Sequence, residues 1–216
     1  MARAFPLSIA EFLDTLPIRS FSMKVGDNRT FTETGGGEII PAARGERLWP
    51  GQITLDLDEH DLIAGIDADL SALEEVGTSF LVYDTRKPYP VSDPTGAAIS
   101  GASPQINALA ANNKELRIAG LPASFELTKG DLVGWTYGSN PTRYALHRIE
   151  VGGTASGAGL SPWIEVTPFI AQGAVAGAPV SLVKPPMKAV FATADYGAGR
   201  AVISEGGTFS FVQTKR

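Results

Sequence analysis

The chain has 216 residues and contains no cysteine. This absence excludes disulfide bonds, thiolate nucleophiles and thiolate metal sites. Histidine is almost as scarce, because only His60 and His147 occur and they lie far apart in the sequence. A serine triad of the hydrolase type would need a G-x-S-x-G elbow, and the sequence has none. Since the residues that usually perform chemistry are nearly missing, we expect no enzymatic activity and no cofactor.

Two further absences concern partners. The chain has 18 Lys and Arg against 23 Asp and Glu, so a formal net charge of −5 leaves no basic excess for general nucleic-acid binding. No apolar run approaches the roughly 20 residues that a membrane-spanning helix needs. The first residues hold no sustained apolar stretch, and we therefore expect no secretory signal.

One acidic cluster has the composition of a cation site. Asp56, Asp58, Glu59 and Asp61 offer the oxygen ligands that Ca²⁺ or Mg²⁺ prefers. Their spacing is not that of an EF-hand, and Asp58 and Asp61 stand where acidic residues belong at the start of a helix. We therefore predict no metal site.

Glycine and proline, in contrast, are abundant, with 24 and 15 residues. In the second half they separate short segments of alternating polarity, at 125–131, 144–149, 163–168 and 179–183. This rhythm is typical of a small β-barrel or sandwich. A last alternating segment, 208–213, predicts a strand that must be tied into a sheet. The sequence thus predicts a mainly β protein with a C-terminal β-barrel domain over 114–216.

The sequence of residues 1–86 indicates a β-rich, sandwich-like domain with one or two short helices. Ser8 and Glu11 have the spacing of a capping box before a short helix that Pro17 ends. The expected elements after it are a hairpin of strands 18–25 and 29–34, a long strand at 47–58, a helix at 61–75 and a strand at 78–84.

Residues 87–113 differ from both halves. Four prolines stand among Gly, Ala and Ser without periodicity, and a stretch of this length is usually a functional loop or a linker. We expect a Pro/Gly/Ala-rich loop or arm here, with Tyr89 and Ile106 as candidate interface residues.

A second set of candidate interface residues lies near the N-terminus. Ile9, Phe12 and Leu13 form the apolar face of the first expected helix. This face packs either on its own domain, which is the simpler alternative, or on a neighbouring subunit.

Several short motifs occur together along the chain. The second half contains Gly130-Asp131, Leu146-His147-Arg148-Ile149, the segment 164–170 and Gly177-Ala178-Pro179-Val180. The first half contains the expected hairpin, Arg47-Leu48-Trp49, the expected helix and the strand at 80–84. In these features the chain resembles the distal tail proteins of long-tailed bacteriophages and their tail-tip β-barrel relatives.

The resemblance implies a structural virion component at the tail tip, assembled in the host cytoplasm. Distal tail proteins form a ring, usually of six subunits, between the tail tube protein and the tail hub with its host-recognition apparatus. A cyclic ring requires two different, matching faces on each subunit. Genomic DNA passes through the lumen without specific binding, and lumen carboxylates would repel its phosphates. The resemblance leaves two alternatives open. The ring has three or six subunits, and the protein takes the position of the distal tail protein or of a neighbouring hub.

The alternative is a carbohydrate-binding module of the same tail, which would recognise host surface glycans. Trp135, Tyr137 and Trp163 are concentrated in the barrel half, and exposed aromatic rings can stack on sugars. Aromatic residues of a barrel also fill its core or a subunit interface, and we favour that interpretation.

Overall fold

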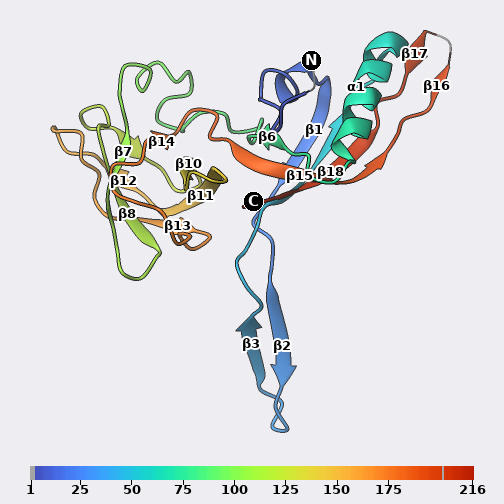
Figure 1. Cartoon of the computed structure of the whole chain (residues 1–216). Coiled ribbons are helices and arrows are strands. Elements are labelled where there is room, and N and C mark those ends of the chain that lie inside the picture. The colour runs from blue at the N-terminus through green and yellow to red at the C-terminus, as the bar shows by residue number, and fades with distance from the viewer. Residues whose placement is uncertain (1–2, 201) are drawn as a thin grey trace.

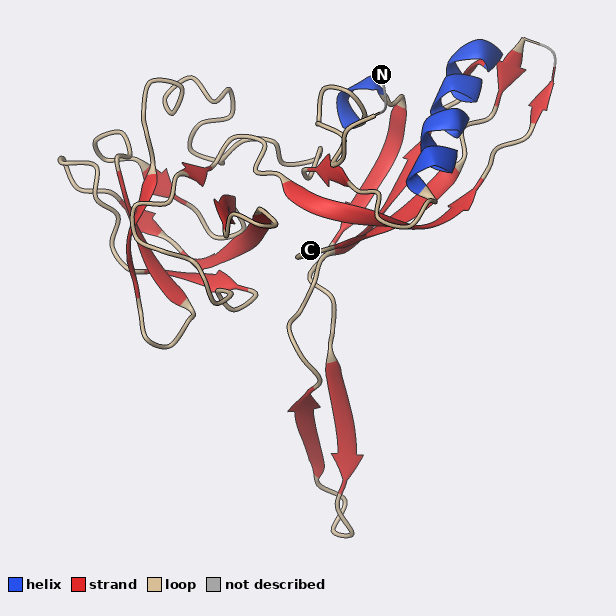
Figure 2. Cartoon of the chain, viewed as in Figure 1, coloured by secondary structure: helices blue, strands red, loops and turns tan. Residues whose placement is uncertain are grey.

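The computed structural model describes residues 3–200 and 202–216, and these residues form two bodies and a protruding hairpin (Figures 1 and 2). The prediction of a mainly β fold with a barrel-like sheet is confirmed. We call residues 7–26, 47–83 and 187–213 the sheet body, residues 84–186 the barrel body, and residues 27–46 the protruding hairpin.

A five-stranded antiparallel sheet forms the sheet body, in the order β1-β4-β18-β15-β6. Its strands are β1 (Ile18–Met23), β4 (Pro50–Leu55), β6 (Phe80–Val82), β15 (Met187–Asp195) and β18 (Thr208–Gln213). Helix α1 (His60–Leu73) lies over one face. A small sheet beside the helix contains β5 (Asp58–Glu59), β16 (Gly199–Arg200) and β17 (Ile203–Ser204).

The core of the sheet body lies between this helix and the sheet. Apolar residues of α1 recur at three- and four-residue spacing, and Ile63, Ile66, Leu70 and Leu73 are all buried. Alternate residues of β18, Phe209 and Phe211, point into the same core. A Cβ atom at Gly51 would lie 2.3 Å from Cζ of Phe211, so only glycine lets this ring lie across the neighbouring strand.

A six-stranded sheet forms the barrel body, in the order β14-β10-β11-β13-β8-β7. Its strands are β7 (Gln105–Leu109), β8 (Glu115–Ala119), β10 (Leu132–Tyr137), β11 (Arg143–Val151), β13 (Ile164–Thr167) and β14 (Val180–Ser181). The short strands β9 (Glu126–Leu127) and β12 (Gly153–Thr154) pair beside it. The two edges of the sheet meet, because Ile106 N–H donates to Ala178 O at 2.9 Å and Val180 N–H to Pro104 O at 2.8 Å. The sheet is therefore nearly closed.

The barrel body is inserted between two neighbouring strands of the sheet body. Val82 of β6 pairs with Met187 of β15, and the chain between them forms the barrel. The strand pairing therefore crosses the predicted boundaries of 1–86, 87–113 and 114–216. Strands β15 and β18 belong to the predicted C-terminal domain, but their inward residues complete the core of the first sheet. Within 87–113, residues 105–109 form strand β7, so this segment is not an isolated loop or arm.

Two local predictions for the first half are wrong. Segment 8–16 forms turns and a short 3₁₀ helix, η1 (Leu13–Thr15). The two capping-box contacts nevertheless form, because Ser8 N–H donates to Glu11 Oε2 at 3.0 Å and Glu11 N–H donates to Ser8 Oγ at 3.3 Å. The expected hairpin is also replaced, because β1 pairs with β4 while β2 (Arg29–Glu33) pairs with β3 (Ile39–Ala43). Residues 24–28 pass from one sheet into another and do not turn back on β1.

Candidate interaction site

The protruding hairpin is the feature that the bodies leave most exposed. Figures 1 and 2 show β2 and β3 extending away from both bodies. Residues 34–38 join the strands, with Gly37 at a φ of 81° and the Glu38 N–H donating to Thr34 Oγ1 at 3.2 Å. A two-stranded hairpin is marginally stable by itself, and further strands or packing against a helix are needed to stabilise it.

Three large apolar side chains of the hairpin are exposed to solvent. Phe31 is 59% exposed, Ile39 is 64% exposed and Ile40 is 50% exposed. Phe31 lies opposite Pro41, and Glu33 opposite Ile39, so both pairs lie on the same face of the ladder. Exposed apolar residues gathered on one element mark an interaction surface.

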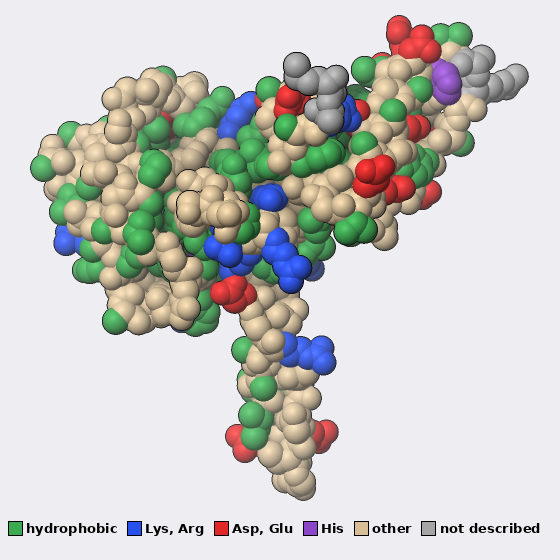
Figure 3. All heavy atoms as spheres, viewed as in Figure 1, with side chains coloured by type: hydrophobic (Ala, Val, Ile, Leu, Met, Phe, Trp, Pro, Cys, Tyr) green, Lys and Arg blue, Asp and Glu red, His purple; other side chains and the backbone are tan. Residues whose placement is uncertain are grey.

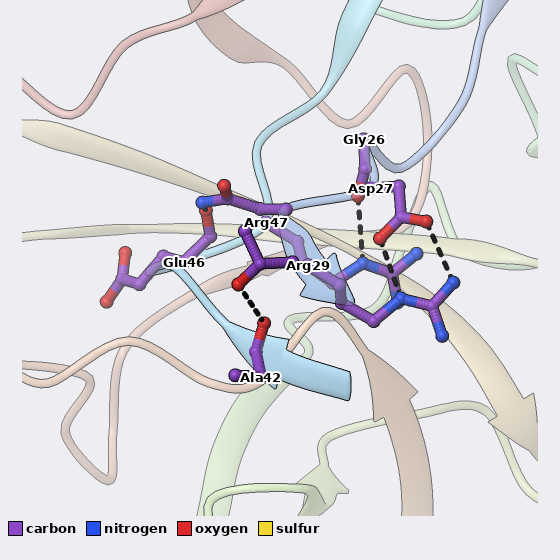
Figure 4. Close-up of polar contacts among 8 residues, drawn as sticks. Gly26, Asp27, Arg29, Ala42, Glu46 and Arg47 are labelled. Atoms are coloured by element: carbon purple, nitrogen blue, oxygen red, sulfur yellow. Dashed lines mark hydrogen bonds and ion pairs between the residues drawn. The ribbon is translucent and has the colours of Figure 1, made fainter. Parts of the chain in front are cut away.

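Polar contacts at the base hold the hairpin in position (Figure 4). Arg29 donates from Nε and Nη2 to the two carboxylate oxygens of Asp27, at 2.7 and 2.8 Å. This bidentate contact lowers the pKa of Asp27 from its ordinary value. Arg47 Nε donates to Gly26 O at 2.9 Å, and Asn28 Nδ2 donates to Glu46 O at 3.2 Å. The last two contacts connect the two segments of the hairpin where they leave the sheet body.

The hairpin base continues into the contact between the two bodies. Trp49 is fully buried, and its indole N–H donates to Leu146 O of the barrel body at 2.8 Å. The Arg148 guanidinium lies over the Trp49 ring, 5.1 Å from its centre. Gln213 Nε2 donates to Tyr144 O at 3.2 Å. Because Trp49 directly precedes β4, one side chain joins hairpin base, sheet and barrel.

A cavity of about 350 Å³ lies at the hairpin base. Arg29, Arg47, Phe169 and Lys215 are among the residues that line it. Lys215 forms an ion pair with Glu46, and burial lowers the pKa of its amine. The cavity separates the hairpin base from the barrel surface and adds apolar area next to the exposed strands.

The predicted interface residues do not form one surface. Phe12 and Leu13 are fully buried in the sheet body, and Ile9 packs partly buried against the same core. This is the alternative in which the N-terminal segment packs on its own domain. Ile106 is buried in the core of the barrel body, and Tyr89 is half-buried in the same body.

Sequence reasoning missed the protruding hairpin, although a signal was present. Glycines 35–37 stand between two short segments, and neither segment alternates regularly between apolar and polar residues. Phe31, Ile39 and Ile40 lie on both sides of that turn, where a solvent-exposed hairpin would carry charges. Pairing 29–34 with the preceding strand obscures this signal.

The three candidate glycan-binding residues are separated by burial. Trp135 and Tyr137 are buried in the barrel core, whereas Trp163 is 44% exposed. The Arg117 guanidinium lies over the Trp163 ring, 5.7 Å from its centre. Only one of the three rings is therefore available to stack on a sugar.

Both histidines have structural contacts. His147 stacks on Trp135, with ring centres 4.5 Å apart, and its Nδ1 lies 2.8 Å from Pro168 O, to which it donates. Burial lowers the pKa of His147 to about 4, so the ring is neutral at physiological pH. His60 Nδ1 lies 2.7 Å from Ser204 Oγ. Within residues 3–200 and 202–216, no three His, Cys, Asp or Glu side chains gather as metal ligands.

The chain matches no known protein family and no curated protein. Among the described residues, no helix is both long and apolar enough to cross a membrane. The assignment of a function therefore depends on the geometry of this chain.

Proposed function

We propose that this chain is a structural component of a bacteriophage tail tip, a distal-tail-like protein that forms a ring between the tail tube protein and the tail hub. The single observation that carries the proposal is the protruding hairpin with its exposed Phe31, Ile39 and Ile40. A virion protein whose task is assembly needs such a surface, because subunit contacts bury apolar area.

The direction of the hairpin favours a head-to-tail contact. It extends away from both bodies of its own chain, so a neighbouring molecule must supply the surface that covers it. We place a surface other than a second hairpin against it, which makes the interface heterologous, whereas two hairpins that cover each other would form a two-fold dimer. Heterologous interfaces generate a closed ring when the rotation closes. We expect six subunits around an open centre.

The solvent face of α1 supports the channel in this proposal. The helix contains no Lys or Arg, and the exposed carboxylates near it include Asp61, Glu74 and Glu75. An acidic wall would repel the phosphates of the genomic DNA that passes through the ring. We therefore place α1 toward the lumen, and a neutral or basic lumen surface would contradict this placement.

The proposal assigns no catalytic role to any residue and places the protein in the virion. A glycan-binding module has less support, because Trp135 and Tyr137 lie in the barrel core and Trp163 is the one exposed ring of the three candidates. Binding of host polysaccharide that Trp163→Ala abolishes without unfolding the protein would favour the module instead.

The test is assembly of the purified protein over a range of concentrations. We expect negative-stain images of closed rings with an open centre, and a mass by light scattering that corresponds to six subunits. The double variant Phe31→Ser with Ile39→Ser should lose about 2 to 4 kcal/mol of association energy per contact and remain monomeric. Val76→Ser is the matched control, since Val76 is fully exposed away from the hairpin.

Two results would contradict the proposal. One is a wild-type protein that stays monomeric up to its solubility limit. The other is a double variant that forms rings as readily as the control. Circular dichroism spectra and melting curves of both variants must match the wild type, so that unfolding does not imitate a loss of assembly.

A further inference from the structure

A cleft between the two bodies gathers basic side chains. Two adjoining hollows of about 430 and 460 Å³ share Arg86 as a lining residue. We call them together the basic cleft, and its cationic residues are Lys24, Arg86, Lys87 and Arg148. Figure 3 shows Lys and Arg side chains gathered where the two bodies and the hairpin base meet. Pro50 adds partly exposed apolar surface to the lining, whereas Met23 and Leu132 lie behind it in the core.

The basic cleft keeps a positive charge after its internal ion pairs are counted. Arg86 pairs with Asp84 at 2.8 Å, and Lys87 pairs with the fully buried Asp131 at 2.9 Å. Lys24 and Arg148 have no carboxylate partner among the described residues. Four cations against two carboxylates therefore leave two positive charges that a partner can neutralise.

The tip of the protruding hairpin has the complementary character. Glu33 and Glu38 flank its glycine-rich turn, and neither has a cationic partner in the described part of the chain. Figure 3 shows acidic side chains on both sides of the tip. Exposed Ile39 lies directly opposite Glu33, so the tip combines two negative charges with apolar surface. The basic cleft combines two net positive charges with the partly exposed ring of Pro50.

The tip and the basic cleft of one molecule cannot meet. Lys24 lies at the hairpin base, and about ten residues separate Gly26 from Gly36 at the tip. At about 3.3 Å per residue along a strand, the tip extends roughly 30 Å from its own cleft. Two complementary surfaces that point apart on one chain can only be joined between molecules.

We propose that the acidic tip of the protruding hairpin of one copy docks in the basic cleft of the next copy. This inference rests on the proposed head-to-tail assembly and names the two surfaces that form its contact. In this contact Glu33 and Glu38 lie against Lys24 and Arg148, and Ile39 packs on Pro50. Complementary charges set the register of the contact and prevent the tip from docking on the acidic side of α1.

Site-directed crosslinking tests the contact directly, because a chain without cysteine gives each variant a single thiol. Gly36→Cys places the thiol at the tip, where a Cβ atom meets only Thr34 Oγ1 at 3.9 Å. Ser22→Cys places it in the basic cleft, and Ser71→Cys on exposed α1 is the matched control. The Gly36→Cys protein carries a size tag and is mixed with either partner and a short bismaleimide.

We expect the tip variant to crosslink with Ser22→Cys and not with Ser71→Cys. Adding Glu33→Lys and Glu38→Lys to the tip variant should lower the crosslinking rate by about tenfold, because like charges then face each other. Adding Lys24→Glu to the cleft variant should restore part of that rate. An increase from about 0.05 to about 0.5 M salt should slow the wild-type pair, since exposed charges are screened.

Equal crosslinking at Ser22 and Ser71 would overturn the inference, as would the absence of any crosslink. A rate at Ser22 that ignores the charge reversals would overturn it too. Failure of this inference can be distinguished from failure of the proposed function. Rings that form without the tip-to-cleft crosslink would remove only the inference, whereas the crosslink without closed rings would remove the ring and leave this contact standing.

Discussion

Replacing Trp49 by phenylalanine should weaken the contact between the two bodies. Trp49 is fully buried, and its Nε1–H is the donor for Leu146 O at 2.8 Å. Phenylalanine keeps an aromatic ring under the Arg148 guanidinium but has no donor, so the carbonyl oxygen is left unpaired at a cost of about 1–3 kcal/mol. The smaller ring leaves a void that adds about 1 kcal/mol. We expect the free energy of unfolding to fall by about 3 kcal/mol.

Urea unfolding followed by two probes measures this effect. Far-ultraviolet circular dichroism reports both bodies, whereas fluorescence of the remaining Trp135 and Trp163 reports the barrel body. Since Trp49 links the bodies, the two curves should separate in the variant and coincide in the wild type. Trp163→Phe is the control, because an exposed ring should change stability by less than about 0.5 kcal/mol. A Trp49→Phe protein as stable as this control would refute the reasoning.

Two further stability measurements test the interior of each body. Burial holds the pKa of His147 at about 4 against 6.5 in the unfolded chain, so the unfolded state binds the extra proton between these values. Stability should therefore fall as the pH drops from 6.5 to about 4, by up to about 3 kcal/mol, and His147→Gln should remove that part of the loss. Parallel pH profiles of wild type and variant would show the assignment to be wrong. In the sheet body, Gly51→Ala should lower the free energy of unfolding by about 1–3 kcal/mol, because the added methyl group would clash with Phe211. Gly65→Ala on α1 should raise the free energy of unfolding by up to about 1 kcal/mol, because its methyl group enters open space; thermal unfolding measures both effects. Equal melting temperatures for the two glycine variants would contradict the packing argument.

Local sequence patterns predicted the elements better than their partners. The helix expected at 61–75 corresponds to α1 at His60–Leu73, and the strand expected at 208–213 corresponds to β18. Periodicity is a property of neighbouring residues, so it is visible in the sequence alone. The pairing of β18 with β4 is not visible in the sequence alone, because the paired residues, such as Thr54 and Thr208, lie more than 150 positions apart.

The candidate site was harder to predict for a related reason. Phe12, Leu13 and Ile106 are apolar, and apolar residues in regular patterns usually belong to the core. Burial depends on the complete fold, which the sequence pattern does not contain. Phe31, Ile39 and Ile40 look equally apolar in the sequence, and only the separation of β2 and β3 from both bodies distinguishes them.

The insertion of the barrel between β6 and β15 has a consequence for the order of folding. Closing a flexible loop of about 100 residues costs roughly 4 kcal/mol in chain entropy. A barrel that has already folded holds its two ends close together, so β6 and β15 then meet at little further entropic cost. The barrel should therefore gain its hydrogen-exchange protection early, and the sheet, whose central strand β18 depends on that meeting, should follow. The inserted body would act as the nucleus that brings distant strands of the sheet into register.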